Sequence, residues 1–131
     1  MTSGSIAERS PDSGTVEILG VPFHVMTEAQ VIAHVLDRLD RGEGGCVQTI
    51  NLDVLRHWIA EPEKKAACGP ADLVVADGMP LLWAARLQGT PLPERVAGSN
   101  LIYSLTAEAA RRGRSVFFLG GNPGTADATA R

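Results

Sequence analysis

Apolar and polar residues change their spacing several times along the chain, and each change predicts a new element. Residues 16–25 place Val, Ile and Phe at extended spacing interrupted by Gly and Pro, which predicts two short strands joined by a turn. Thr27 fits a capping box, and apolar residues then recur at helical spacing. The pattern predicts a hairpin followed by a helix over 28–41.

The middle of the chain twice repeats a strand followed by a helix. Residues 46–51 form a short apolar-polar run, and helical spacing then continues until Pro62. Residues 73–76 are wholly apolar, as is typical of a buried strand, and a helix over 80–87 is predicted after them. This alternation favours parallel strands.

The last third of the chain continues the alternation. A Pro-rich loop over 89–98 precedes a predicted helix over 99–112, and residues 116–119 form a third apolar run of the buried-strand type. Apolar strands that alternate with helices indicate an α/β class, a Rossmann-like parallel sheet flanked by helices around one core, with an N-terminal edge hairpin. Three short core strands are few for such a sheet, so we expect it to be incomplete.

Composition narrows the class of protein. The 131 residues are 44% hydrophobic and 21% charged, which is ordinary for a globular chain. The net charge of −3 argues against nucleic acid as a partner. Residues 1–14 are rich in Ser, Gly and Pro and predict a disordered leader, which leaves 15–131 as the N-terminal portion of a single α/β domain. No signal peptide is recognisable, so the expected compartment is the cytoplasm.

Two residue types are expected to serve packing alone. Cys46 and Cys68 lie in no metal-binding pattern, and we interpret both as buried thiols. Trp58 and Trp83 fall on the apolar faces of predicted helices and are expected in the core. No metal site is predicted.

Ligands of parallel α/β sheets bind beyond the carboxyl ends of the strands, so the residues that follow each apolar run are the first candidates. Thr49 and Asn51 lie at the carboxyl end of the first run, and Asp77 directly follows the second. A carboxylate at such a place can be partly desolvated and act as a general base. The alternative is that Asp77 caps the helix that begins at Met79 or Pro80.

Two further places could hold phosphate. The turn that contains Gly120, Gly121 and Gly124 lies between an apolar run and a predicted helix, where backbone N–H groups can bind an anion. Such turns also use glycine for steric reasons alone. Arg95, on the Pro-rich loop, could offset the charge of a diphosphate, although an exposed Arg of no function is the commoner outcome.

Several motifs, in matching order and spacing, resemble one family of bacterial enzymes, the WecG/TagA/CpsF glycosyltransferases. They are VEILGVPFHVMTEAQ at 16–30, TINLDVL at 49–55, ADLVVADGMPLLWAARLQG at 71–89, PLPERVAGSN at 91–100 and SVFFLGGNPGTA at 115–126.

The resemblance implies a function. The family transfers a sugar, often N-acetylmannosamine or its uronic acid, from a UDP-sugar donor to an undecaprenyl-diphosphate-linked acceptor, with inversion at the anomeric carbon. Such transfer serves bacterial cell-surface polysaccharide or teichoic acid synthesis. The resemblance implies that no cofactor is needed. It also implies a cytoplasmic protein that contacts the inner face of the membrane peripherally. A homo-oligomer is also expected.

The resemblance also implies roles for single residues. Asp77 matches the family's proposed catalytic base, Thr49 and Asn51 match its substrate-pocket residues, and Arg95 matches an arginine of its active-site loop. The turn over 120–124 is similar to the part that borders the donor diphosphate. One departure is Asn100, where many relatives carry Asp.

Two alternatives remain beside the enzyme. The sequence ends at Arg131, inside an unfinished strand-helix unit, which would also fit a truncated, non-catalytic nucleotide-binding remnant. A nicotinamide oxidoreductase is disfavoured, because the GxGxxG fingerprint and its ribose-binding acidic residue are missing.

Overall fold

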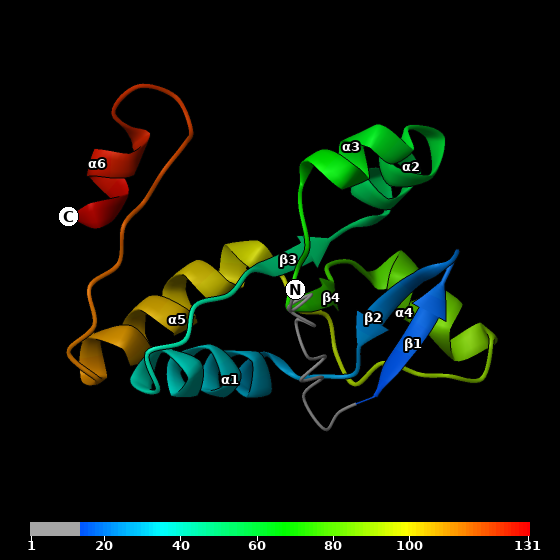
Figure 1. Cartoon of the computed structure of the whole chain (residues 1–131), viewed down its shortest axis with the longest axis horizontal. Coiled ribbons are helices and arrows are strands. Elements are labelled where there is room, and N and C mark those ends of the chain that lie inside the picture. Colours follow the sequence, from blue (N-terminus) through cyan, green and yellow to red (C-terminus); the bar gives the residue numbers. More distant parts are fainter. Residues whose placement is uncertain (1–13) are drawn as a thin grey trace, which may run out of the picture.

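The computed structural model describes residues 14–131 and has two small sheets with helices around them (Figure 1). Strands β1 and β2 pair antiparallel, and strands β3 and β4 pair parallel. The elements, in chain order, are β1 (Thr15–Ile18), β2 (Val21–His24), α1 (Glu28–Asp40), β3 (Val47–Ile50), α2 (Leu52–Ala60), α3 (Pro62–Ala67), β4 (Leu73–Ala76), α4 (Met79–Leu87), α5 (Gly98–Arg111) and α6 (Thr125–Ala130).

The parallel pair is covered on both faces. Leu73 and Val75 of β4 point into a cluster of buried side chains from α1 and α5. The alternate residues, Val74 and Ala76, point into a second cluster with side chains from α2, α4 and the hairpin. This alternation is the period of a strand between two layers, and it confirms the predicted α/β class. Two clusters take the place of the single core that was expected.

The N-terminal hairpin forms as predicted and lies beside β4. Leu19 and Gly20 have φ angles of 51° and 78°, which suit a tight two-residue turn between β1 and β2. At the end of β2, Nδ1 of His24 accepts a hydrogen bond of 3.0 Å from the backbone N–H of Val74. The hairpin therefore covers the edge of β4 through a side chain, while its own two strands remain a separate sheet.

Helices α1 and α5 lie side by side, and their carboxyl ends are joined by ion pairs. The predicted capping box is confirmed, with Thr27 as the N-cap of α1. Arg112 reaches Asp37 at 3.0 Å and Asp40 at 2.8 Å, and Arg114 reaches Asp40 at 2.8 Å. Hydrogen bonding from Arg114 holds the pKa of Asp40 below its ordinary value. These pairs are exposed, so each contributes little stability by itself.

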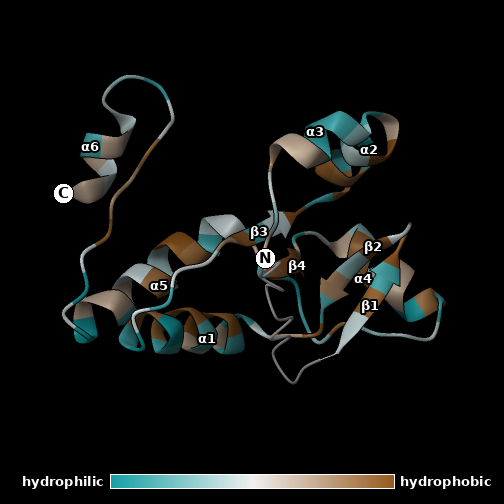
Figure 2. Ribbon diagram, viewed as in Figure 1, coloured by the Kyte–Doolittle hydropathy of each residue, from teal (hydrophilic) through white to brown (hydrophobic). Residues whose placement is uncertain are grey.

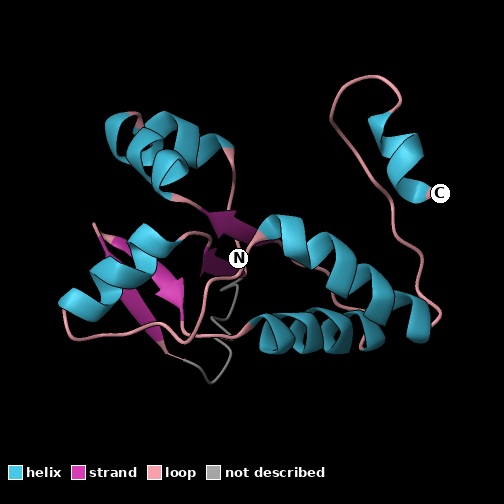
Figure 3. Ribbon diagram, turned by 180° about the vertical axis from the view of Figure 1, so that it is seen from behind, coloured by secondary structure: helices cyan, strands magenta, loops and turns pink. Residues whose placement is uncertain are grey.

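The predicted third strand over 116–119 is wrong. These residues are irregular coil, and Phe117 and Leu119 expose 86% and 91% of their surface. Figure 2 shows the apolar stretch in brown on the coil between α5 and α6, and the view from behind in Figure 3 again separates that coil from the sheets.

The edges of the existing sheet give the physical reason. An apolar run becomes a strand only where a neighbouring edge offers it hydrogen bonds. On β4, that edge is already occupied by His24, and by the N–H of Val96, which donates to the carbonyl of Ala76 at 2.9 Å. Arg114 is held at the end of α1, which directs the following residues away from β3.

Three smaller expectations also fail. Cys46 and Cys68 are exposed rather than buried, because both lie at the ends of elements. Trp58 is buried as predicted, but Trp83 is 56% exposed. On α4, the buried residues are Leu81 and Ala85, one turn apart, and Trp83 lies between them on another face.

Two further points concern boundaries. Helix α2 ends at Ala60, near Pro62 as predicted, and Pro62 then occupies the first turn of α3, an additional helix that was not predicted. The predicted leader lies almost wholly outside the described residues. Among residues 14–131, no helix combines the length and the apolar character needed to cross a membrane.

Candidate active site at the carboxyl ends of the parallel strands

Asp77 is held between the sheet and the start of α5. Its backbone N–H donates to the carbonyl of Ile50 at 2.9 Å, which continues the β3–β4 ladder by one residue. Its side chain is half-buried, and Oδ2 accepts a hydrogen bond of 3.4 Å from the backbone N–H of Gly98. Gly98 is the first residue of α5, where N–H groups lack partners within the helix. One oxygen of the carboxylate is thereby held in place, whereas Oδ1 has no hydrogen bond among the residues that the structure describes.

Thr49 lies against the same helix start. A Cβ atom placed on Gly98 would come within 2.9 Å of the Thr49 hydroxyl oxygen, which is closer than real Cβ contacts. The side chain of Thr49 belongs to the face of β3 that α5 covers, because it alternates with Ile50. Thr49, Asp77 and Gly98 therefore meet at the carboxyl end of the parallel strands β3 and β4, which we call the carboxyl edge of the sheet. The sequence predicts this position for Thr49 and Asp77.

The alternative that Asp77 caps the following helix, α4, is wrong. The N-cap of α4 is Gly78, and no side chain caps that helix. Gly78 has a φ of 137°, a backbone conformation that side chains rarely adopt, and it turns the chain from β4 into α4. The carboxylate of Asp77 is thus available at the edge of the sheet and contacts α5, a helix that lies distant in sequence.

Asn51 has a structural task at the start of α2. It is the N-cap of α2, and its Oδ1 accepts a hydrogen bond of 2.9 Å from the N–H of Val54. An Asn just before a helix is a preferred cap. Asn51 is exposed, two residues beyond Thr49, so it lies at the predicted edge with its side-chain oxygen already engaged.

Arg95 also belongs to this edge. Its neighbour Val96 is buried and hydrogen-bonded to Ala76, the residue just before Asp77. The side chain of Arg95 is exposed, and within residues 14–131 it has neither an ion-pair nor a hydrogen-bond partner. A guanidinium without a protein partner remains able to bind an anion through paired hydrogen bonds.

The glycine-rich turn is not brought to this edge. Gly120, Gly121 and Gly124 are exposed and have φ angles of 110°, 79° and 85°. They lie on the coil that leads into α6, apart from the sheets in Figures 1 and 3. Their N–H groups are not close to Asp77 in this arrangement.

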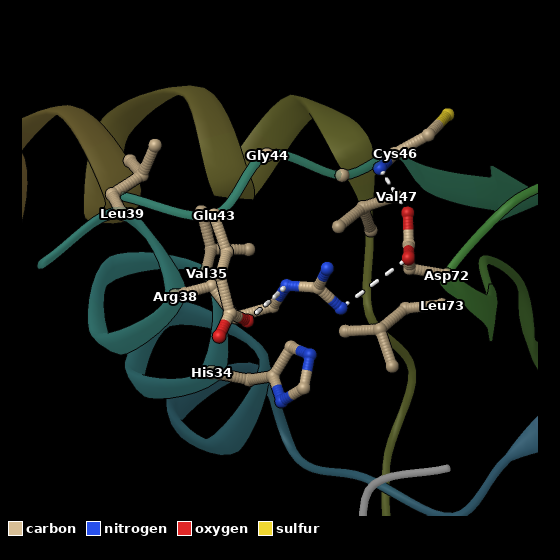
Figure 4. A pocket seen from close by; sticks show the side chains of 11 residues that line it. His34, Val35, Arg38, Leu39, Glu43, Gly44, Cys46, Val47, Asp72 and Leu73 are labelled. Carbon is tan, nitrogen blue, oxygen red and sulfur yellow. Dashed lines mark hydrogen bonds and ion pairs between the residues drawn. The ribbon is translucent and has the colours of Figure 1, made fainter. Parts of the chain in front are cut away.

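A pocket at the opposite, amino end of β3 and β4 is shown in Figure 4. Arg38 crosses it, with Nη1 3.3 Å from Asp72 and Nε 3.5 Å from Glu43. Asp72 also accepts a hydrogen bond of 2.6 Å from the N–H of Cys46. Burial, and then the charge of Arg38, lower the pKa of His34 beside it. These charges engage one another and join α1 to the strands, so we assign the pocket a structural role.

Gly98 is the functional candidate that sequence reasoning missed. Its position at the start of a predicted helix is a signal for a close approach or an anion site, but the sequence does not tell which strand that helix faces. No group of three or more His, Cys, Asp or Glu within residues 14–131 is arranged to hold a metal ion.

Comparison with known proteins identifies the family. The model of the "Glycosyl transferase WecG/TagA/CpsF family" matches residues 16–131, nearly all of the chain. The chain belongs to this family. Every candidate residue named above lies within the matched range.

One curated relative also matches part of the chain. It comes from Bacillus spizizenii, is named N-acetylglucosaminyldiphosphoundecaprenol N-acetyl-beta-D-mannosaminyltransferase, and is 32% identical over 82 residues. The match covers 63% of this chain but only 32% of the relative, so it spans about a third of that protein.

Proposed function

We propose that this chain carries the acceptor-activating edge of an inverting glycosyltransferase. The donor would be a UDP-sugar, with N-acetylmannosamine as the first candidate, and the acceptor a lipid-diphosphate-linked sugar of cell-surface polymer synthesis. The observation that carries the proposal is the half-buried carboxylate of Asp77 at the carboxyl end of β4, next to Thr49 and the start of α5. Family membership and the name of the relative support the reaction class.

Asp77 would act as the general base. Its free oxygen takes the proton of the acceptor hydroxyl while the hydroxyl oxygen attacks the anomeric carbon of the donor. The bond between that carbon and the diphosphate oxygen breaks on the opposite face, so the configuration inverts and UDP leaves with the electron pair. The hydrogen bond from Gly98 keeps the carboxylate in one orientation, which limits the motion needed before proton transfer.

The negative charge that develops on the departing diphosphate requires a positive group or backbone donors. Arg95 is our candidate, because its guanidinium is exposed on a loop hydrogen-bonded to β4. We propose Thr49 and Asn51 as substrate contacts at the same edge. Gly120, Gly121 and Gly124 are proposed to border the diphosphate from the family pattern alone, since they lie apart from Asp77 here.

The acceptor chemistry implies a location. A lipid-linked acceptor is presented at a membrane surface, so we propose a cytoplasmic protein that contacts the inner face of the membrane peripherally. Self-association remains part of the proposal.

The test is transfer by the intact protein from UDP-N-acetylmannosamine to N-acetylglucosaminyl-diphosphoundecaprenol. We expect a product of inverted anomeric configuration by NMR. Arg95→Ala should lower kcat by about 10-fold to 1,000-fold, and Arg95→Lys by less, because lysine keeps the charge and loses the planar fork. Arg86→Ala is the matched control. It removes an exposed arginine of α4, outside the loop that carries Arg95, and should leave kcat unchanged. Retention of configuration, or equal small effects of both Arg95 variants, would contradict the proposal.

A further inference from the structure

The loop between α4 and α5 has no regular secondary structure, yet it is held on both sides of Arg95. Before it, Oε1 of Glu94 accepts a hydrogen bond of 2.6 Å from the backbone N–H of Glu28, the first residue of α1. After it, the N–H of Val96 donates to the carbonyl of Ala76 at 2.9 Å. Arg95 is thus the one residue between two fixed neighbours, which restricts the backbone angles that aim its side chain.

The Glu94 contact uses a donor that α1 cannot satisfy by itself. The capping box already engages the N–H groups of Thr27 and Gln30, and the N–H of Glu28 has no partner within the helix. A carboxylate near a helix N-terminus is also favoured by the helix dipole. The side chain of Glu28 in turn accepts a hydrogen bond of 2.8 Å from Ser104 of α5. The loop, α1 and α5 are therefore linked through adjoining groups.

We propose that Glu94 is a positioning residue for Arg95, one that fixes the guanidinium where the departing diphosphate of the donor would bind. The inference rests on the proposed function, because it assumes that Arg95 acts on the diphosphate. Glu94 itself is engaged with α1 and does not touch substrate in this role. Without its bond, the loop before Val96 is free to move, and binding or catalysis must then order it at an entropic cost.

The competing explanation is that Glu94 only stabilises α1. The two explanations predict different effects on kcat when Glu94 and Arg95 are replaced together. A positioning residue matters only while Arg95 is present, so its removal should have no further effect on kcat in an Arg95→Ala background. If Glu94 only stabilises the fold, its removal should lower activity by the same factor, and the melting temperature by the same number of degrees, in both backgrounds.

The experiment is a double-mutant cycle with Glu94→Ala and Arg95→Ala in the intact protein, using UDP-N-acetylmannosamine and the lipid-linked acceptor. We expect Glu94→Ala to lower kcat by about 10-fold to 100-fold, with a small change in KM for the donor. Glu94→Gln keeps an oxygen acceptor at the same reach and should restore most of kcat. Glu63→Ala, on exposed α3, is the matched carboxylate control.

Three results would overturn the inference. They are multiplicative losses in the double variant, a Glu94→Gln variant as impaired as Glu94→Ala, or wild-type kcat in Glu94→Ala. Asp77→Asn is measured in the same series to separate the two proposals. If Asp77→Asn and Arg95→Ala are impaired but Glu94 and Arg95 act independently, the proposed function stands and only the positioning role fails. If Asp77→Asn keeps the turnover of the wild type, Asp77 is not the general base and the proposed function fails.

Discussion

Replacement of Gly98 by alanine should push the start of α5 away from β3. The new Cβ atom would lie 2.9 Å from the hydroxyl oxygen of Thr49, about half an ångström closer than ordinary contact. Thr49 is β-branched and sits in a strand, so its hydroxyl cannot rotate away freely. Overpacking of this kind costs about 1 to 3 kcal/mol. Alanine gains at most about 1 kcal/mol over glycine in a helix, so the net effect should be a loss of stability.

Urea unfolding of four proteins measures this interaction: wild type, Gly98→Ala, Thr49→Ala and the double variant. Thr49→Ala removes the clashing oxygen, so Gly98→Ala should then become neutral or stabilising, and the sign of its effect should change between the two backgrounds. Gly44→Ala, at an open position, is the control and should change stability by less than about 0.5 kcal/mol. If Gly98→Ala has the same effect in both backgrounds, the packing of α5 on Thr49 described above is incorrect.

Two further predictions concern other parts of the chain. Because burial and Arg38 lower the pKa of His34 below 6.5, the folded chain binds this proton less readily than the unfolded chain, so stability should fall as pH drops from 6.5 toward the lowered value. His34→Gln should flatten that dependence in unfolding measurements, and an unchanged slope would contradict it. Phe117, 86% exposed, should promote self-association, so Phe117→Lys should shift sedimentation of the 131-residue chain toward monomer. Identical sedimentation of the variant and the wild type would exclude a role for Phe117 in self-association.

Local patterns sufficed for most of the elements. The helix from Glu28, the strand of residues 73–76 and the hairpin each follow from spacing and capping within a short window. Residues 116–119 have the same apolar character as 73–76, yet only 73–76 form a strand. The difference is tertiary, because a strand needs an edge to pair with, and His24 and Val96 occupy the edge of β4. No window of sequence contains that information.

The candidate site divides in a similar way. The rule that ligands bind beyond the carboxyl ends of parallel strands placed Thr49 and Asp77 together. It did not identify Gly98, which meets both of them, because the facing of α5 depends on how the helix packs. Nor did it identify Glu94, whose partner Glu28 lies 66 residues away in the chain. Contacts of this range become visible only in the folded structure.

The central claim is that Asp77 removes the proton of the acceptor. Asp77→Asn in the intact protein tests it most directly, because the amide has nearly the same shape and keeps an oxygen for the N–H of Gly98 but cannot take a proton. Single-turnover kinetics with UDP-N-acetylmannosamine, together with calorimetry of UDP binding, should show turnover reduced by about 100-fold or more while affinity for UDP stays nearly unchanged. Turnover close to that of the wild type would contradict the account and leave Asp77 with only its structural bond to α5.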